Sequence, residues 1–229
     1  GQQNTVEADY ATAVGGYQNS VGGAGKWSAI ISGQQGTVDG QYGGMFSSDK
    51  GTQSGNFAVV VGGKQTEAGF QYTATFGGDG SIADKGYAIA LGGTDNTSSE
   101  QGAITIGGQG NEATGVDSIV MGGNDNYASK TDAMIVGGDS NEAAFASTMV
   151  IGANDAKAEI GKYAIVVGGY KGNAAKQYAA VFAGDTALAG TSDHAVTIGG
   201  ANASAEGKWS VVVGDSSGST SSDYEVHTP

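Results

Sequence analysis

Residue types used in hydrolytic catalysis occur side by side at Ser192, Asp193 and His194. A nucleophile, a base and an orienting acid must converge in space, and three neighbours in sequence cannot do so. The second histidine, His227, lies near the end of the chain, so the two histidines lack the spacing of metal ligands. The sequence therefore predicts no catalytic residue and indicates a protein that is not an enzyme.

Loop carboxylates and amides raise the question of calcium binding. They recur at Asp95, Asn96, Asn124, Asp125, Asn126, Asp139, Asn154 and Asp155. Calcium-binding β-rolls repeat a nonapeptide of glycine and aspartate, and the EF-hand loop needs its glycine and terminal glutamate; neither pattern occurs here. Asn and Asp are also favoured in turns. We interpret these residues as turn formers and predict no bound metal and no cofactor.

An apolar run that ends in small residues recurs along the chain. Aligning fourteen such runs places the first turn residue at positions 15, 32, 47, 62, 77, 92, 107, 122, 137, 152, 168, 183, 199 and 214. Ten of the thirteen steps are 15 residues long, and the other three are 16 or 17. Runs such as FAVVVGG from Phe57 are typical of a short buried strand that meets a sharp turn. Glycine holds the first turn position in eleven runs, which predicts positive φ there.

A second strand is expected in the rest of each repeat, where a small residue recurs. This residue is Ala68, Ala83, Ala113, Ala128, Ala143, Ala158, Ala174, Ala189 or Ala205. We therefore expect an all-β protein, a parallel β-roll (solenoid) of about fourteen 15-residue coils. Residues 1–9 are expected to form a lead-in, residues 10–215 the repeats, and residues 216–229 a serine-rich tail that leaves the repeat.

Side chains along a strand alternate between two faces, and this alternation divides the apolar run. Its last position, as in Val61 and Leu91, and the position two residues earlier, as in Val59 and Ile89, are expected to form the core. The middle position is then expected to face outward, although it is also apolar, and strands covered on both faces have this composition. We predict that other copies of the chain cover it. The predicted interface consists of Ile30, Met45, Val60, Val120, Ile135, Val150, Val166, Val181 and Val212.

A column of aromatic residues lies five positions before the turn residue. It contains Tyr10, Trp27, Tyr42, Phe57, Tyr72, Tyr87, Tyr163, Tyr178 and Trp209, and is interrupted by Gly102, Asp117, Asp132 and Ser147. Stacked coils bring these rings into a ladder, which could bind a partner or seal the edge of the roll. The interruption could mark a second, more acidic surface, or sequence drift along a tolerant repeat. The candidate partner-binding residues are Tyr72, Tyr87, Asp117, Asp132, Tyr163 and Tyr178.

The charge balance restricts the kinds of partner. Ten lysines, no arginine and 23 acidic residues give a net charge of −13, which repels a phosphate backbone and an anionic membrane surface. We predict no nucleic-acid partner. No apolar run approaches the length of a membrane span, so we also expect no direct membrane insertion by this segment. The chain has no cysteine, which is compatible with an exported protein.

The segments DSIVMGGNDNYAS from Asp117 and KWSVVVGD from Lys208 resemble the head repeats of YadA-like trimeric autotransporter adhesins. The resemblance covers about residues 10 to 215, in fourteen units in register. It implies a left-handed roll, a homotrimer, an extracellular location on a cell surface with an outer-membrane anchor outside this segment, and binding of host matrix or receptor proteins. No neck motif, heptad stalk or anchor of that family is recognisable in the sequence.

Three other functions would each leave a recognisable pattern in the sequence. A phage tail fibre or tailspike that cleaves glycans would need paired carboxylates in a groove, and none stand out. An ice-binding solenoid would need threonines in register, whereas Thr12, Thr75 and Thr148 fall in different columns. A phage tail-fibre or tailspike rod that binds a receptor and a structural surface-filament subunit stay open as alternatives.

Overall fold

The computed structural model describes residues 1–190, 192–214 and 217–228, and every regular element in them is a short β-strand. No helix occurs in these residues. The contacts divide the chain into two units, Gly1–Thr114 and Gly115–Pro229. Counting one two-residue and one three-residue strand as a coil, the thirty strands make about fifteen coils. The prediction of an all-β parallel solenoid is therefore confirmed.

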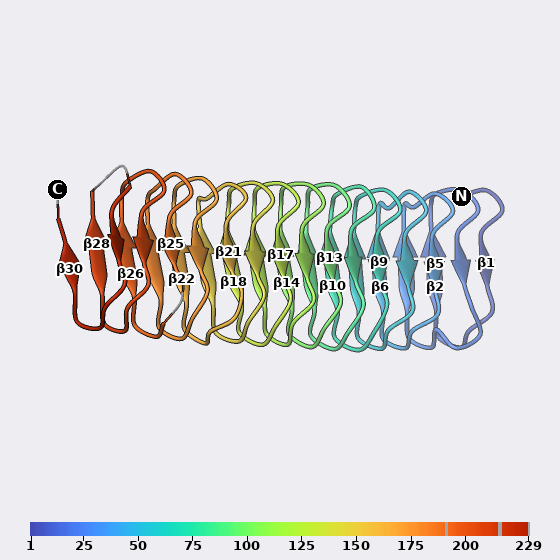
Figure 1. The fold of residues 1–229 in the computed structure, drawn as a ribbon. Helices are drawn as coiled ribbons and strands as arrows, with labels where there is room; N and C mark the ends of the chain where they lie inside the picture. Colours follow the sequence, from blue (N-terminus) through green and yellow to red (C-terminus); the bar gives the residue numbers. More distant parts are fainter. Residues whose placement is uncertain (191, 215–216, 229) are drawn as a thin grey trace. The chain divides into compact units, whose positions relative to one another are not determined.

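Unit 1 contains the first half of the strands, with odd numbers on one side of each coil and even numbers on the other (Figure 1). They are β1 (Thr5–Val6), β2 (Thr12–Val14), β3 (Ser20–Val21), β4 (Ala29–Ile31), β5 (Thr37–Val38), β6 (Gly44–Phe46), β7 (Thr52–Gln53), β8 (Val59–Val61), β9 (Glu67–Ala68), β10 (Ala74–Phe76), β11 (Ile82–Ala83), β12 (Ile89–Leu91), β13 (Thr97–Ser98), β14 (Ile104–Ile106) and β15 (Glu112–Ala113).

Unit 2 repeats the arrangement with the three-residue strand first. Its strands are β16 (Ile119–Met121), β17 (Tyr127–Ala128), β18 (Met134–Val136), β19 (Glu142–Ala143), β20 (Met149–Ile151), β21 (Lys157–Ala158), β22 (Ile165–Val167), β23 (Asn173–Ala174), β24 (Ala180–Phe182), β25 (Leu188–Ala189), β26 (Val196–Ile198), β27 (Ser204–Ala205), β28 (Val211–Val213), β29 (Ser219–Thr220) and β30 (Val226–His227).

Within each unit, a strand pairs in parallel with the equivalent strand of the next coil. In unit 1, Val60 of β8 lies beside Thr75 of β10, and Ala68 of β9 lies beside Ala83 of β11. The longer repeats do not disturb this register, because Thr12 pairs with Ala29 across a 17-residue step. Their extra residues lie in the turn from an odd-numbered strand to the next even-numbered one. Each coil therefore superimposes its side chains on those of its neighbours, which produces columns along the unit.

Four side chains per coil point inward: the middle residue of the even strand, the second residue of the odd strand, and the residue just before each strand. In one coil of unit 1 these are Ala58, Val60, Thr66 and Ala68, all of them buried. The interior is thin, because the two facing sheets are joined by turns of only a few residues. Small residues therefore dominate three of the four inward columns, and the middle of the even strand supplies the largest side chains.

The prediction of which residues of the apolar run point inward is wrong: the inward and outward positions are exchanged. All nine residues of the predicted interface are fully buried inside their own chain: Ile30, Met45, Val60, Val120, Ile135, Val150, Val166, Val181 and Val212. The two columns predicted as core, represented by Val59 and Val61, lie on the outside and are partly exposed. The physical reason is the thin interior, which accepts one medium-sized side chain per even strand and not the paired bulky ones of the flanking columns.

Buried asparagines hold successive coils together from the inside. Asn96 Oδ1 accepts a hydrogen bond from the backbone N–H of Asn111 in the next coil, at 3.0 Å. The amide nitrogen of Asn96 donates to the carbonyl oxygens of Gly92 and Gly107, at 3.0 and 3.2 Å. Asn19 makes the same kind of bond to the N–H of Gly36. Polar side chains are accommodated in this core because they satisfy the turn backbone.

The turn after each even strand has the expected left-handed backbone. Gly62 has a φ of 68°, and the residues that replace glycine at the same place keep the conformation, with φ of 57° at Ser32 and 42° at Ala183. The prediction of positive φ at this position is confirmed. Glycine is favoured there because it adopts this conformation without steric cost.

The repeat extends further at both ends than the sequence indicated. Thr5–Val6 of the expected lead-in pairs with Ser20–Val21, and Asn4 begins the internal asparagine bonds. In the expected tail, β29 pairs with β27, and β30 pairs with β28. The end coils were missed because they lack the apolar run of the other repeats: their strands are Thr5–Val6 at one end, and Ser219–Thr220 and Val226–His227 at the other.

Candidate binding surface

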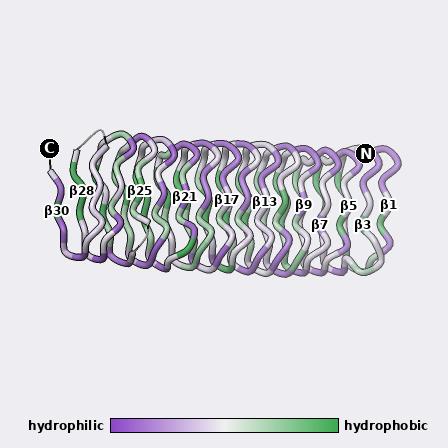
Figure 2. The backbone as a smooth tube through the Cα atoms, in the orientation of Figure 1, coloured by the Kyte–Doolittle hydropathy of each residue, from purple (hydrophilic) through white to green (hydrophobic). Residues whose placement is uncertain are grey.

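The outer face of the even-numbered strands is apolar. We use outer face for the first and third residues of these strands, which point away from the core. Its exposed members in unit 1 include Val14, Ile31, Phe46, Phe76 and Ile106, and those in unit 2 include Phe182 and Ile198. No charged residue occurs in the two columns. Figure 2 shows hydrophobic residues along strands and hydrophilic residues at many of the turns of each unit.

Each phenylalanine of the outer face is preceded two residues earlier by a small residue, which makes the face more level. Gly44 precedes Phe46, and a Cβ placed at Gly44 would lie 3.2 Å from Phe46 Cε2, so this ring leans over the glycine. The phenylalanines Phe76 and Phe182 likewise follow alanine two residues earlier. A level apolar surface of this kind packs well against another flat surface.

The opposite sheet has a different outward composition. The first residue of the odd-numbered strands is polar in most coils, as in Thr37, Thr52, Glu67 and Thr97, and is mostly half-buried. The second residue points inward and is buried. This mainly polar-out, apolar-in pattern is typical of a sheet face in contact with water. The two sides of the solenoid therefore differ in composition, and the outer face is the apolar one.

The predicted aromatic column forms a ring ladder in each unit. In unit 1 the centroids of successive rings are 4.1 to 6.4 Å apart, with interplanar angles of 3° to 10°. The stacked residues are Tyr10, Trp27, Tyr42, Phe57, Tyr72 and Tyr87. In unit 2 the ladder contains Tyr163, Tyr178, His194 and Trp209. Each ring edge faces solvent, while most ring faces are covered by the next ring.

The predicted partner-binding residues fall into three groups. Tyr72 stacks on Tyr87 in unit 1, and Tyr163 stacks on Tyr178 in unit 2. The third group, Asp117 and Asp132, occupies the ladder position of two coils of unit 2, and both residues are exposed. All six residues have positive φ, so the turn orients them in the same way whether or not they carry a ring. The aspartates therefore lie in the same column as the rings but are not part of a stack.

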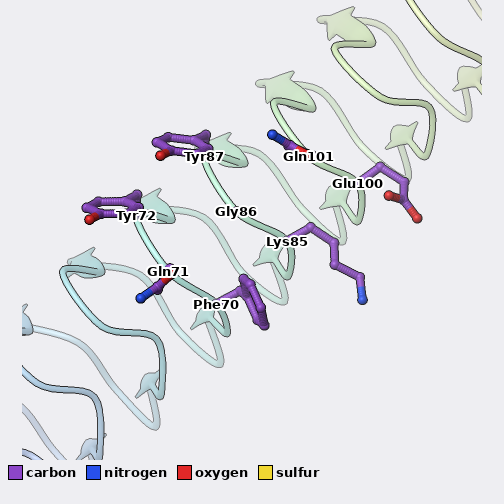
Figure 3. Close-up of a pocket in the computed structure, with 8 residues that line it drawn as sticks. All are labelled: Phe70, Gln71, Tyr72, Lys85, Gly86, Tyr87, Glu100 and Gln101. Carbon is purple, nitrogen blue, oxygen red and sulfur yellow. The ribbon is translucent and has the colours of Figure 1, made fainter.

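A groove lies beside the ladder at Tyr72 and Tyr87 (Figure 3). We call it the Tyr87 groove, and its volume is about 430 Å³. It is lined by Phe70, Gln71, Tyr72, Lys85, Gly86, Tyr87, Glu100 and Gln101. In Figure 3 the tyrosines lie on one side, Phe70, Lys85 and Glu100 on the other, and the glutamines between them. The combination of aromatic edges, amides and both signs of charge is typical of a ligand site.

Sequence reasoning found two of the groove residues, Tyr72 and Tyr87, and missed the others. The polar lining belongs to the two positions before the ladder residue, which vary from coil to coil and carry no periodic signal. Gly86 stands between Gln71 and Gln101 in one of these columns and leaves a gap between the two glutamines. Only the stacking of three coils brings these residues together.

Unit 2 has a groove at the equivalent turns. It is lined by Phe145, Ile160, Gly161, Lys162, Lys176, Gln177 and Asp193, with a volume of about 480 Å³. Here too an aromatic ring, a glycine, lysines, an amide and an acid surround a depression. The insertion in this coil places Ile160 in the turn, and its side chain is exposed.

The residue types that act in catalysis or metal binding in other proteins make packing and ion-pair contacts here. His194 stacks between Tyr178 and Trp209, at 4.9 and 3.8 Å between ring centroids. Among the described residues, no three side chains from His, Asp and Glu gather as metal ligands would. Glu159, by a hydrogen bond and by its charge, and Glu142 of the preceding coil raise the pKa of Lys157 above its ordinary value. Partly exposed pairs of this kind contribute about 0–1 kcal/mol each.

Comparison with models of known protein families gave no match, and comparison with curated proteins gave none either. In the described ranges, no helix has the length and apolar character needed to cross a membrane. The outer face, the ring ladders and the grooves are therefore the features that bear on function.

Proposed function

We propose that this chain is the non-enzymatic binding head of a cell-surface attachment protein, that its roll is left-handed, and that it assembles as a homotrimer. The observation that carries the proposal is the uncovered, level outer face of the even-numbered strands in each unit. Large apolar patches on soluble proteins mark interaction sites. The ring ladders and grooves lie at the turns beside this face, so they remain available to a host matrix or receptor protein after assembly.

A second and third copy of the same chain are the occupants that fit this face best. Identical coils have identical spacing, so in parallel copies each coil can place its apolar residues against those of the equivalent coil. The outer face contributes no charge, although the chain has a net charge of −13, and association therefore places no like charges in contact. The resemblance to trimeric adhesin heads supports three copies rather than two.

The mass of the chain in solution tests the assembly. We expect a species of three times 22.5 kDa in sedimentation equilibrium and light scattering. The double variant Leu91→Asp with Ile106→Asp introduces charge into the outer face of two coils, and we expect it to sediment as a monomer with unchanged β-sheet circular dichroism.

The matched control introduces the same charge on the opposite sheet. Thr52→Asp with Thr97→Asp alters two outward, half-buried positions of the odd-numbered strands, and it should leave the mass unchanged. A monomeric wild-type chain, or an outer-face variant that keeps the wild-type mass, would contradict the proposal.

A further inference from the structure

The ring ladder of unit 1 ends with an uncovered ring face. Tyr87 stacks on Tyr72 at 5.1 Å, and the next ladder position is Gly102, which has no side chain. Among the described residues, no ring stacks on the other face of Tyr87. Its exposed fraction is 57%, compared with 45% for Tyr72, which lies between two rings. The glycine thus leaves a gap of about one strand spacing, 4.8 Å, in the ladder.

The Tyr87 groove adjoins this gap and contains unpaired polar groups. Lys85, Glu100 and Gln101 line the Tyr87 groove in the same coil as the ring and in the following one. Their side chains make no hydrogen bond or ion pair with any residue that the structure describes. The groove therefore offers an ammonium donor and a carboxylate acceptor on its side opposite the tyrosines, and between the two sides an amide that both donates and accepts.

A pyranose ring has the complementary chemistry. One of its faces consists of C–H groups, which are attracted to the negative face of an aromatic ring. Hydroxyl groups radiate from the rim of each unit of a glycan, so those of the stacked unit and of its neighbour in the groove can donate to Glu100 and Gln101 and accept from Lys85. A phenyl side chain could also stack on Tyr87, but it would leave all three polar groups without partners, and such groups are costly to desolvate.

We propose that the free face of Tyr87 and the adjoining Tyr87 groove together bind a glycan: one pyranose unit stacks on Tyr87 above Gly102, beside Gln101, and a neighbouring unit is hydrogen-bonded by Lys85 and Glu100 in the groove. This inference deepens the proposed attachment function by naming the ligand class, a glycan carried on the host surface. It does not depend on trimer formation, because every residue involved belongs to unit 1 of a single chain.

The test begins with capture of the wild-type chain on an array of neutral, N-acetylated and acidic pyranose glycans. Titration calorimetry and saturation-transfer NMR then follow the best-bound glycan. We expect Tyr87→Ala to weaken binding at least about tenfold, through loss of the stacking surface.

Gly102→Tyr provides a variant that retains the fold. Tyrosine occupies this ladder position at positive φ in other coils, such as those of Tyr72 and Tyr163, so the backbone accepts it. The new ring should extend the ladder, cover Tyr87 and abolish binding. Tyr42→Ala, in the interior of the same ladder, is the matched control and should leave the affinity unchanged.

The inference is overturned if no glycan on the array is captured, or if Gly102→Tyr and Tyr87→Ala bind as the wild type does. Capture of a non-glycosylated protein with the same dependence on Tyr87 would also overturn it. Self-association of the chain is measured separately, so a failure of glycan binding with an intact trimer would leave the attachment proposal in place.

Discussion

The ladder position shows how backbone conformation selects residue type. Its occupants have φ between 55° and 68° in the fourteen coils from Trp27 to Tyr224, a region that β-branched residues avoid. Its occupants are Tyr, Trp, Phe, His, Gly, Asp and Ser, without one Val, Ile or Thr. The sequence thus contained a signal for a left-handed turn residue, and this signal explains why aspartate and serine replace the rings without disturbing the coil.

One core residue departs from the repeat and is matched by a compensating glycine. Gln53 is fully buried in a column otherwise filled by residues such as Val38 and Ala68, and its Oε1 atom has no hydrogen-bond partner. Its Nε2 donates to the carbonyl oxygen of Gly55. A Cβ at Gly43 would collide with Gln53, so the glycine provides the space that the amide fills.

We therefore predict opposite effects for a single and a double substitution. Gly43→Ala alone should destabilise the chain, because the methyl group meets the buried amide. Gly43→Ala with Gln53→Val should stabilise it by about 1–3 kcal/mol, since the unsatisfied oxygen is removed and the space is refilled. Urea denaturation followed by circular dichroism measures both. A double variant less stable than the wild type would contradict this account.

At the scale of the elements, the spacing of the repeats was sufficient to predict the strands, but not which side chains of each strand point into the core. Alternation separates two sets of side chains without saying which set is inside. The decisive property is volume: the middle column includes Ala90 and Thr75, whereas the flanking column has Phe76 and Leu91. A thin coil accepts the first set in its interior, and the bulky set is left outside. The polar lining of the Tyr87 groove could not be predicted, because it depends on the alignment of non-periodic turn residues.

The internal asparagines make the coil sensitive to pH when one is converted to an acid. We predict that Asn96→Asp destabilises the chain at neutral pH, because a buried carboxylate would face the carbonyl oxygens of Gly92 and Gly107. Burial raises the pKa of this carboxyl group above about 3.9, its unperturbed value, so the folded state holds the proton more tightly than the unfolded state.

Stability of this variant should therefore fall as the pH rises through the unfolded-state pKa, and level off above the raised pKa of the folded state. Below pH of about 4 the protonated acid can again donate a hydrogen bond, and part of the loss should be recovered. Thermal unfolding between acidic and neutral pH measures the effect. The wild-type chain, scanned in parallel, corrects for the titration of its other carboxyl groups.

At the scale of the whole molecule, stability is expected to be distributed along each unit. In stacked repeats each coil contacts only its neighbours, so a coil with one neighbour is held less firmly. The first strands of unit 1, β1 and β2, are largely exposed, whereas β8 has a fully buried middle residue. All three strands nevertheless make parallel backbone hydrogen bonds to the next coil.

Hydrogen exchange should reveal this gradient. We predict that the amides of Thr5 and Thr12 exchange at least about tenfold faster than those of Val59 and Ala74, which have the same hydrogen-bond geometry. Mass spectrometry or NMR of the intact chain measures the rates. Uniform protection along unit 1 would indicate that the coils unfold as one cooperative body instead.

The glycine at position 102 also affects how many ligands a repetitive protein of this kind could hold. A ring inside an unbroken ladder shows only its edge, since its neighbours cover both faces. Adding further identical coils would therefore lengthen the molecule without creating a new docking point. The number of ligands bound would instead equal the number of interruptions in the ladder. Loss of one aromatic residue from the middle of a ladder would then add a contact site rather than remove one.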